Sequence, residues 1–511
     1  MRWSRRGTAL EAQLLAVAAW AGISLATPVH RAAASEAAVA EVARAAYVAD
    51  YRGGITRLRA MVGTDPRDIE ALLGVGALQF LGAFATLQEG LWQHAGMEPS
   101  ASARQLGRLS RMLPTGMFFG TPALVPPNPN ATPMTYTALR GLVKRFAEDL
   151  AVAEASLAKL GDRPVKLPVD PFQIALDLNH DGRIEPHERL LAAFSGRAPE
   201  GTTIAFDTAD ASWLRGYANL LMASANLLLA CDFERSYEAV GHNMYGLAAT
   251  AFGRALKRQS EAAGAKAELE AIDARLQALA QSPNEARRRE IIRQMGTIAS
   301  AQPLTVEQKR LSEEMARLTE ADQARQREVR ALMLARIRLI AGGQQRDPGD
   351  WSGVLDLVAF VHTMSWPVVE PERLKAVRTH LLQVMAINRE TWRLVRAETD
   401  DDREWLPSAR QTAAIGGRHL TDEVIDSWLA TTALAEQVLK GEKLLAHPRF
   451  TKGVNLKKLL ETAPRIDVVM MIAGQDLAPY LESGEIADGL KWQEITRPMQ
   501  QNLWLYALWF N

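Results

Sequence analysis

The sequence predicts a mainly α-helical fold, built as a helical bundle, and three observations support this prediction. Residues 136–160 place apolar side chains three and four positions apart, which puts them on one face of a helix. Thr421 and Gly441 stand where a helix between them needs its N-terminal cap and its C-terminal glycine. Residues 211–231 are apolar on most faces, which predicts a buried central helix.

Composition limits the possible functions. The chain has 511 residues, of which 48% are hydrophobic, so it can build a large core or two or three domains. Lys plus Arg equals Asp plus Glu at 59 each, which gives no electrostatic reason to expect a nucleic-acid partner. The nine histidines are scattered, and Cys231 is the only cysteine, so zinc, haem and an intramolecular disulfide are not expected.

The first residues predict export. Arg2, Arg5 and Arg6 precede an apolar run at residues 14–25, which ends in small residues at a plausible cleavage point. We therefore expect a signal peptide at residues 1–26 and a periplasmic or secreted protein. The run falls short of the roughly 20 apolar residues of a membrane span, so no span is expected after cleavage. The alternative is an uncleaved anchor or simply a first helix.

Residues 35–160 are expected to form an N-terminal helical region. Apolar residues share one helical face, Asp65-Pro66 breaks the helix, and a second apolar-periodic stretch follows at residues 69–81. This pattern resembles one unit of a tetratricopeptide repeat, with its face formed by Tyr51, Ile55, Leu58 and Met61. Because a stacked array needs about three repeats, a single hairpin packed on the main body is expected.

The most informative stretch is the twelve residues 177–188. Side-chain oxygens occur at its first, third, fifth, ninth and twelfth places, in Asp177, Asn179, Asp181, Glu185 and Glu188. Gly182 is sixth, where the chain must turn with a positive φ that costs a glycine little. Arg183 is seventh and can offer its backbone carbonyl. Alternating oxygens around such a turn are the donors that a calcium ion takes.

The stretch resembles the calcium loop of an EF-hand, including the apolar Ile184 at the eighth place. The resemblance implies a Ca²⁺ ion as cofactor, with Glu188 as a bidentate ligand and Glu185 binding directly or through water. The metal ligands it implies are Asp177, Asn179, Asp181, Arg183 and Glu188. The alternative is an acidic turn that caps a helix beginning near Pro186, without metal.

The flanks of this loop depart from the EF-hand pattern. Pro168 and Pro171 leave only residues 172–176 for the entering helix, and no second loop of this kind occurs in the chain. A single EF-hand of the bacterial exported type, with a structural ion and no signalling lever, is therefore expected in residues 161–200. The short segment around Ile204 joins this region to the central helix, so the ion is expected to fix how two helical parts meet.

Residues 205–511 are expected to form the main helical domain, with a charged helical hairpin inserted at about residues 256–342. The inserted part is rich in Ala, Glu, Gln, Arg and Lys, and it keeps a narrow apolar seam at Leu269, Ile272, Leu276 and Leu279. It is predicted to project from the bundle. Two interpretations stay open, a partner-binding or dimerising arm and a merely solvated surface.

No catalytic motif appears. The sequence has no nucleophile elbow, phosphate-binding glycine loop or dinucleotide fingerprint, and Cys231 lies in an apolar stretch that makes a thiol inert. We expect a non-enzymatic, exported calcium-binding protein in which one EF-hand-type site braces a helical scaffold or binding protein. The alternative is a cell-envelope polysaccharide hydrolase or lyase with a structural calcium, because paired catalytic carboxylates leave no local signature. A zymogram on cell-wall material would distinguish the two.

Overall fold

A computed structural model shows a mainly helical chain. It describes residues 36–94, 128, 130–179, 181–190, 203–246, 249–260, 265–279, 284–297, 306–340, 352–399, 403–404, 411–413 and 421–487. The predicted signal peptide and part of the predicted calcium region, residue 180 and residues 191–200, lie outside these ranges. The described residues form two compact units, one drawn from residues 1–249 and 353–511 and the other from residues 250–352.

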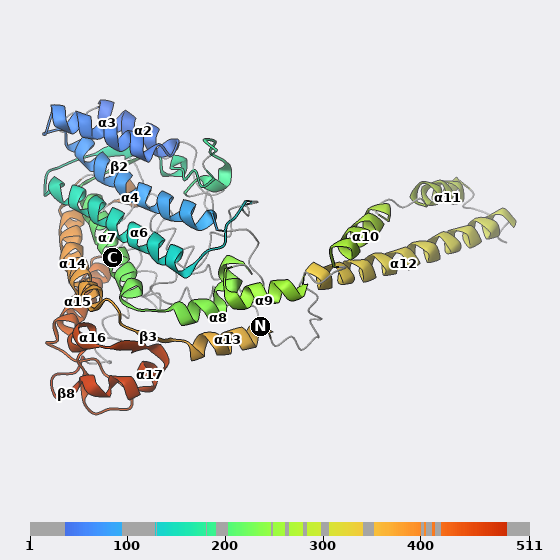
Figure 1. Ribbon diagram of the computed structural model, residues 1–511. Helices are drawn as coiled ribbons and strands as arrows, with labels where there is room; N and C mark the ends of the chain where they lie inside the picture. The colour runs from blue at the N-terminus through green and yellow to red at the C-terminus, as the bar shows by residue number, and fades with distance from the viewer. Residues whose placement is uncertain are drawn as a thin grey trace. The chain divides into compact units, whose positions relative to one another are not determined.

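The first unit opens with three consecutive helices, α2 (Glu36–Tyr47), α3 (Tyr51–Thr64) and α4 (Ile69–Trp92), shown in Figure 1. Asp side chains start two of them: Asp50 Oδ1 accepts from Gly53 N at 3.1 Å, and Asp68 Oδ1 accepts from Ala71 N at 2.8 Å. The break predicted at Asp65-Pro66 is the turn between α3 and α4. The hairpin is therefore present, and its likeness to a tetratricopeptide unit stays a prediction.

The centre of this unit is built from α4, α6 (Tyr136–Leu157), α7 (Thr208–Ala230) and α14 (Pro371–Ala397). Trp213 and Tyr217 of α7 are buried and stack with ring centroids 5.3 Å apart. The predicted central helix is confirmed as α7, which is buried along most of its length. Within the described residues, α4 is the one helix long and apolar enough to cross a membrane, and most of its apolar stretch is buried in the protein, as in a core helix.

The remaining helices of this unit are short or lie at its periphery. They are α8 (Glu234–Tyr245), α13 (Ser352–His362), α15 (Asp422–Lys440), α16 (Leu456–Thr462) and α17 (Val468–Ala473). As predicted, Thr421 caps α15, and Gly441 ends it with φ +75°. Short 3-10 turns occur at Ala158–Leu160, Pro171–Gln173, Pro186–Glu188 and Gln475–Tyr480.

Among the described residues, every sheet has two strands. Three pairs are antiparallel and one is parallel, and each strand has two or three residues. The antiparallel pairs are β1 (Leu167–Val169) with β2 (Ile204–Phe206), β3 (Ser365–Pro367) with β7 (Arg465–Asp467), and β6 (Gly453–Val454) with β8 (Leu481–Glu482). The parallel pair is β4 (Arg403–Glu404) with β5 (Thr412–Ala413).

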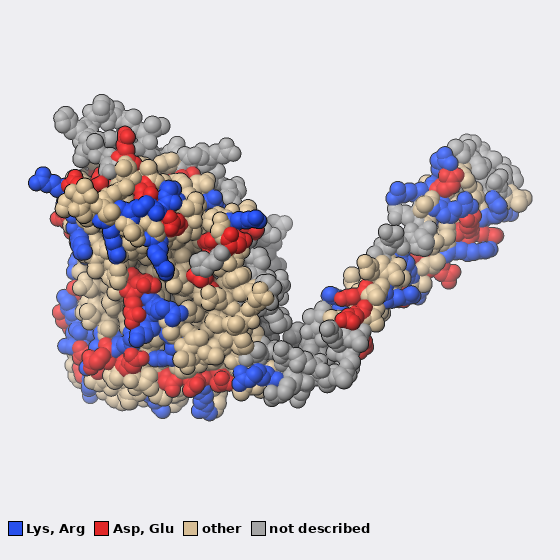
Figure 2. All heavy atoms as spheres, turned by 45° about the horizontal axis from the view of Figure 1, so that its top comes forward, with Lys and Arg blue, Asp and Glu red and all other residues tan. Residues whose placement is uncertain are grey.

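The second unit contains α9 (Ala251–Ser260), α10 (Ala265–Ala278), α11 (Glu285–Thr297) and α12 (Val306–Ile340), with α10 and α11 both packed along α12. Ion pairs show that α12 runs antiparallel to α10 and α11. Going along the sequence from α10 to α11, the paired residue lies earlier in the sequence of α12. Arg275 Nε lies 2.8 Å from Glu328 Oε1, and Arg287 Nε lies 2.7 Å from Glu314 Oε1. The buried seam is narrow, and charges of both signs alternate along this unit and over the visible face of the first unit (Figure 2).

Candidate metal site

The predicted calcium loop lies in the excursion of the chain between β1 and β2. These two strands pair in antiparallel register, with Val169 opposite Ile204, so the excursion begins and ends at one place. Directly after β2, Asp207 caps α7. The loop is therefore connected to the buried central helix through a two-stranded ribbon.

Strand-type pairing closes the base of the loop, where an EF-hand would have two helices. Ala175 and Arg189 form an antiparallel bridge, and Leu176 N donates to Glu188 O at 2.8 Å. The prediction of a helix beginning near Pro186 is wrong for the described residues, since only the 3-10 turn Pro186–Glu188 forms there. The physical reason is that pairing with the incoming segment uses the backbone groups that a longer helix would need.

Inside the loop, the first, third and fifth side chains turn back onto backbone N–H groups. Asp177 Oδ2 accepts from Gly182 N at 3.1 Å, Asn179 Oδ1 accepts from Asp181 N at 3.0 Å, and Asp181 Oδ1 accepts from Arg183 N at 2.8 Å. Gly182 has φ +73°, the left-handed conformation expected at the sixth place. The positive φ predicted at Gly182 is therefore confirmed, while the calcium loop itself stays a prediction.

Glu188 is buried and holds the two halves of the loop together. Its Oε1 accepts from Leu178 N and its Oε2 accepts from Glu185 N, both at 3.0 Å. By contrast, Asp177 Oδ1 is buried and has no hydrogen-bond partner. A buried acceptor left without a partner costs roughly 1–3 kcal/mol, so this oxygen is the one position among the described loop residues that calls for a further ligand.

The carboxylate oxygens of the described loop residues do not converge on a common centre. Among the residues that the structure describes, no group of three or more His, Cys, Asp or Glu side chains is placed to hold a metal ion. A carboxylate oxygen that accepts one N–H keeps a second lone pair, and every predicted donor is an oxygen, as calcium prefers. The donors fit calcium chemically, and binding would need the side chains of Asp177, Asp181 and Glu188 to turn toward a common centre.

Three contacts anchor the base of the loop to the turn between α2 and α3. Ala175 N donates to Ala46 O at 2.9 Å, Tyr51 Oη donates to Ala175 O at 2.5 Å, and Arg189 Nη1 donates to Tyr47 O at 3.0 Å. Burial raises the pKa of Tyr51, which keeps its hydroxyl protonated as a donor. Sequence reasoning missed Arg189, which follows the twelve residues directly and carries no motif of its own.

A second group of carboxylates surrounds the start of α7. Asp207 Oδ1 accepts from Ala209 N at 2.7 Å and from Asp210 N at 3.1 Å, and Asp207 N donates to Asp210 Oδ2 at 3.2 Å. Burial, together with the nearby charge of Asp207, holds the pKa of Asp210 well above its usual range. Glu398 also hydrogen-bonds to Asp207. These carboxylates cap and join elements, which is a structural role.

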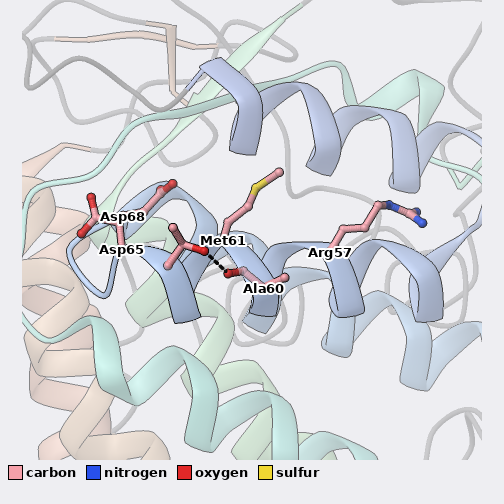
Figure 3. Close-up of a pocket in the computed structure, with 6 residues that line it drawn as sticks. Arg57, Ala60, Met61, Asp65 and Asp68 are labelled. Carbon is pink, nitrogen blue, oxygen red and sulfur yellow. Dashed lines mark hydrogen bonds between the residues drawn. The ribbon is translucent and has the colours of Figure 1, made fainter.

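A pocket of about 480 Å³ lies beside the α3–α4 turn (Figure 3), lined by Arg57, Ala60, Met61, Thr64, Asp65 and Asp68. Figure 3 shows the two aspartates at one end and Arg57 at the other. Asp68 is the N-cap of α4 and accepts a hydrogen bond from Ala71 N, and Arg57 forms an ion pair with Glu41, with Nε 2.8 Å from Oε1. The polar groups around this pocket therefore serve the helices themselves and do not converge on a ligand.

The lone thiol does not form a reactive centre. Cys231 is buried at the C-terminal end of α7, and burial raises its pKa to about 12. The loop at residues 177–188 is thus the site whose chemistry remains to be explained. No family model matches this chain, and neither do the curated proteins or the solved structures with which it was compared.

Proposed function

We propose that this chain is an exported calcium-binding protein, without enzymatic activity, in which one EF-hand-type loop braces a helical scaffold or binding protein. The observation that supports it most is the buried, unpartnered Asp177 Oδ1 at the first place of the loop. Calcium would be held by Asp177, Asn179, Asp181, the Arg183 carbonyl and Glu188. The ion would supply positive charge to a loop with four carboxylates and one arginine in twelve residues.

The contacts of the loop explain why the ion would act as a brace. On one side Arg189 and Tyr51 tie the loop base to α2 and α3, and on the other side β2 leads into α7. Fixing the loop therefore restrains the N-terminal hairpin and the central helix together. The described flanks, up to residue 190, are 3-10 turns and paired backbone, and they contain neither of the two helices that swing apart in calcium sensors.

Chemical denaturation with and without calcium tests this proposal. Extracellular-type sites bind calcium with a dissociation constant of about 10⁻⁴ to 10⁻³ M, and at ten times that concentration binding adds about 1.4 kcal/mol to the free energy of unfolding. Asp177→Ala should abolish this increment. Asp162→Asn, which alters an exposed carboxylate outside the loop, should keep it. Equal unfolding midpoints of the wild type in calcium and in chelator would refute the proposal.

The charged second unit is proposed as the surface for a protein partner. Met333 and Leu334 are neighbouring large apolar residues of α12, and both are about half exposed. A double change of these two residues to serine should abolish capture of a partner by the full chain. Val306→Ser, at the exposed start of the same helix, is the matched control. Capture that survives the double change would exclude this stretch of α12.

A further inference from the structure

Helix α13 turns an aliphatic face toward solvent. Five of its side chains are 40–65% exposed, and their spacing places them on one side of the helix. They are Val354, Leu355, Leu357, Val358 and Val361. Isolated exposed aliphatic residues are normal on a protein surface, whereas a contiguous group of five on one helix face is a candidate surface for an apolar partner.

The polar side of α13 faces the protein. Asn243 Nδ2 of α8 donates to Asp356 Oδ2 at 3.0 Å, and His242 Nε2 lies 3.9 Å from Asp356 Oδ1. Asp356 is the only Asp, Glu, Lys or Arg in α13, and Figure 1 shows this helix beside α8. The usual amphipathic arrangement is thereby reversed, with the one carboxylate held inward and the aliphatic side chains held outward.

We propose that this face of α13 binds the surface of a phospholipid membrane. The helix has 11 residues and is about 16 Å long, too short to cross a hydrocarbon core of about 30 Å but sufficient to lie flat in the interface. Asp356 would not be carried into the lipid, because it is held against α8. This proposal is independent of the calcium loop.

The size of the face favours a membrane over a second copy of the chain. A fully buried Val or Leu side chain removes about 60–120 Å² from water, so five partly exposed ones offer about 200–300 Å². A standard protein interface buries roughly 800 Å² on each partner. A lipid surface needs no such area and no complementary shape, since each aliphatic side chain partitions into it separately.

Co-sedimentation with vesicles tests the proposal on the full chain. Vesicles of equal parts phosphatidylethanolamine and phosphatidylglycerol should bind the wild type, and Leu355→Ser with Val358→Ser should weaken binding at least about tenfold. The matched control is Val469→Ser with Ile472→Ser, a pair of exposed aliphatic residues on α17. Both double variants should unfold at the wild-type midpoint, because the replaced side chains are exposed. Binding that the α13 pair leaves unchanged, or the α17 pair weakens equally, would overturn the proposal.

A local probe keeps the test independent of any other membrane-binding segment. Since Cys231 is buried, Leu355→Cys introduces the one accessible thiol of the described chain, to which an environment-sensitive dye can be attached. Its emission should shift to the blue on adding vesicles, and a dye at Ile472→Cys should not respond. An unchanged emission at position 355 overturns the proposal. So does a wild-type dimer that becomes monomeric in the α13 double variant, because the face would then belong to a second copy.

Discussion

Replacing Glu188 by glutamine separates the two roles that this residue has in the loop. Its carboxylate accepts one hydrogen bond from Leu178 N and one from Glu185 N, and it is proposed as a calcium ligand as well. A glutamine side chain keeps only one oxygen, so its NH₂ group must face one of the two N–H donors. The variant is therefore expected to lose stability even in the presence of a chelator.

The magnitude follows from the burial of the site. Glu188 is 2% exposed, so the N–H left without an acceptor has no water to replace it, and the cost is about 1–3 kcal/mol. In calcium, the variant should also lose the binding increment, about 1.4 kcal/mol at ten times the dissociation constant. The total loss in calcium should then reach about 2–4 kcal/mol.

Urea unfolding at constant temperature, followed by tryptophan fluorescence, measures both parts. Wild type and Glu188→Gln are each unfolded in calcium and in chelator. For each protein, the free energy of unfolding in chelator is subtracted from that in calcium, and comparing the two results isolates the contribution of the ion. Asp162→Asn serves as the exposed control. If Glu188→Gln is as stable as the wild type in chelator, the two backbone hydrogen bonds do not hold the loop, and the structural role of the Glu188 carboxylate is refuted.

Three other predictions concern single positions. Gly182→Ala should cost about 1 kcal/mol in urea unfolding, because φ is +73° while no atom lies within 4 Å of the added Cβ. Cys231 should be unreactive toward an aromatic disulfide reagent in the native protein and react fully in urea, since burial raises its pKa to about 12. The raised pKa of Asp210 makes its contribution to stability largest below the pKa of the unfolded state, and this contribution is lost as the pH rises through the folded pKa. Asp210→Asn should therefore flatten the decline of the urea midpoint with rising pH.

Features that depend on neighbours in the chain could be predicted from the sequence. Thr421 and Gly441 mark the ends of α15, Asp207 caps α7, and Gly182 takes a positive φ. Each of these follows from the stereochemistry of a few consecutive residues, so a local pattern is sufficient. The buried character of α7 was also predictable, because apolar residues on most faces of a helix leave no side for water.

Long-range contacts could not be predicted in the same way. Nothing in the sequence around Arg189 indicates that its guanidinium reaches Tyr47 O, more than a hundred residues earlier. The outward aliphatic face of α13 was equally hidden, since an apolar period alone does not say which side of a helix meets the core. The prediction of a helix after Pro186 failed for a related reason, because the pairing of Ala175 with Arg189 competes for the same backbone groups.

The closure of the loop by backbone pairing determines what an ion could contribute. The bridge between Ala175 and Arg189 and the bond from Tyr51 to Ala175 O involve none of the proposed ligands, so they hold the loop base in place whether or not calcium binds. An ion would act on the outer part of the loop, from Asp177 to Glu188, and would add to the restraint at the base through Glu188, whose carbonyl accepts from Leu176 N. Its effect should be an increment of stability at the junction of the hairpin with α7, and the fold itself should form without it.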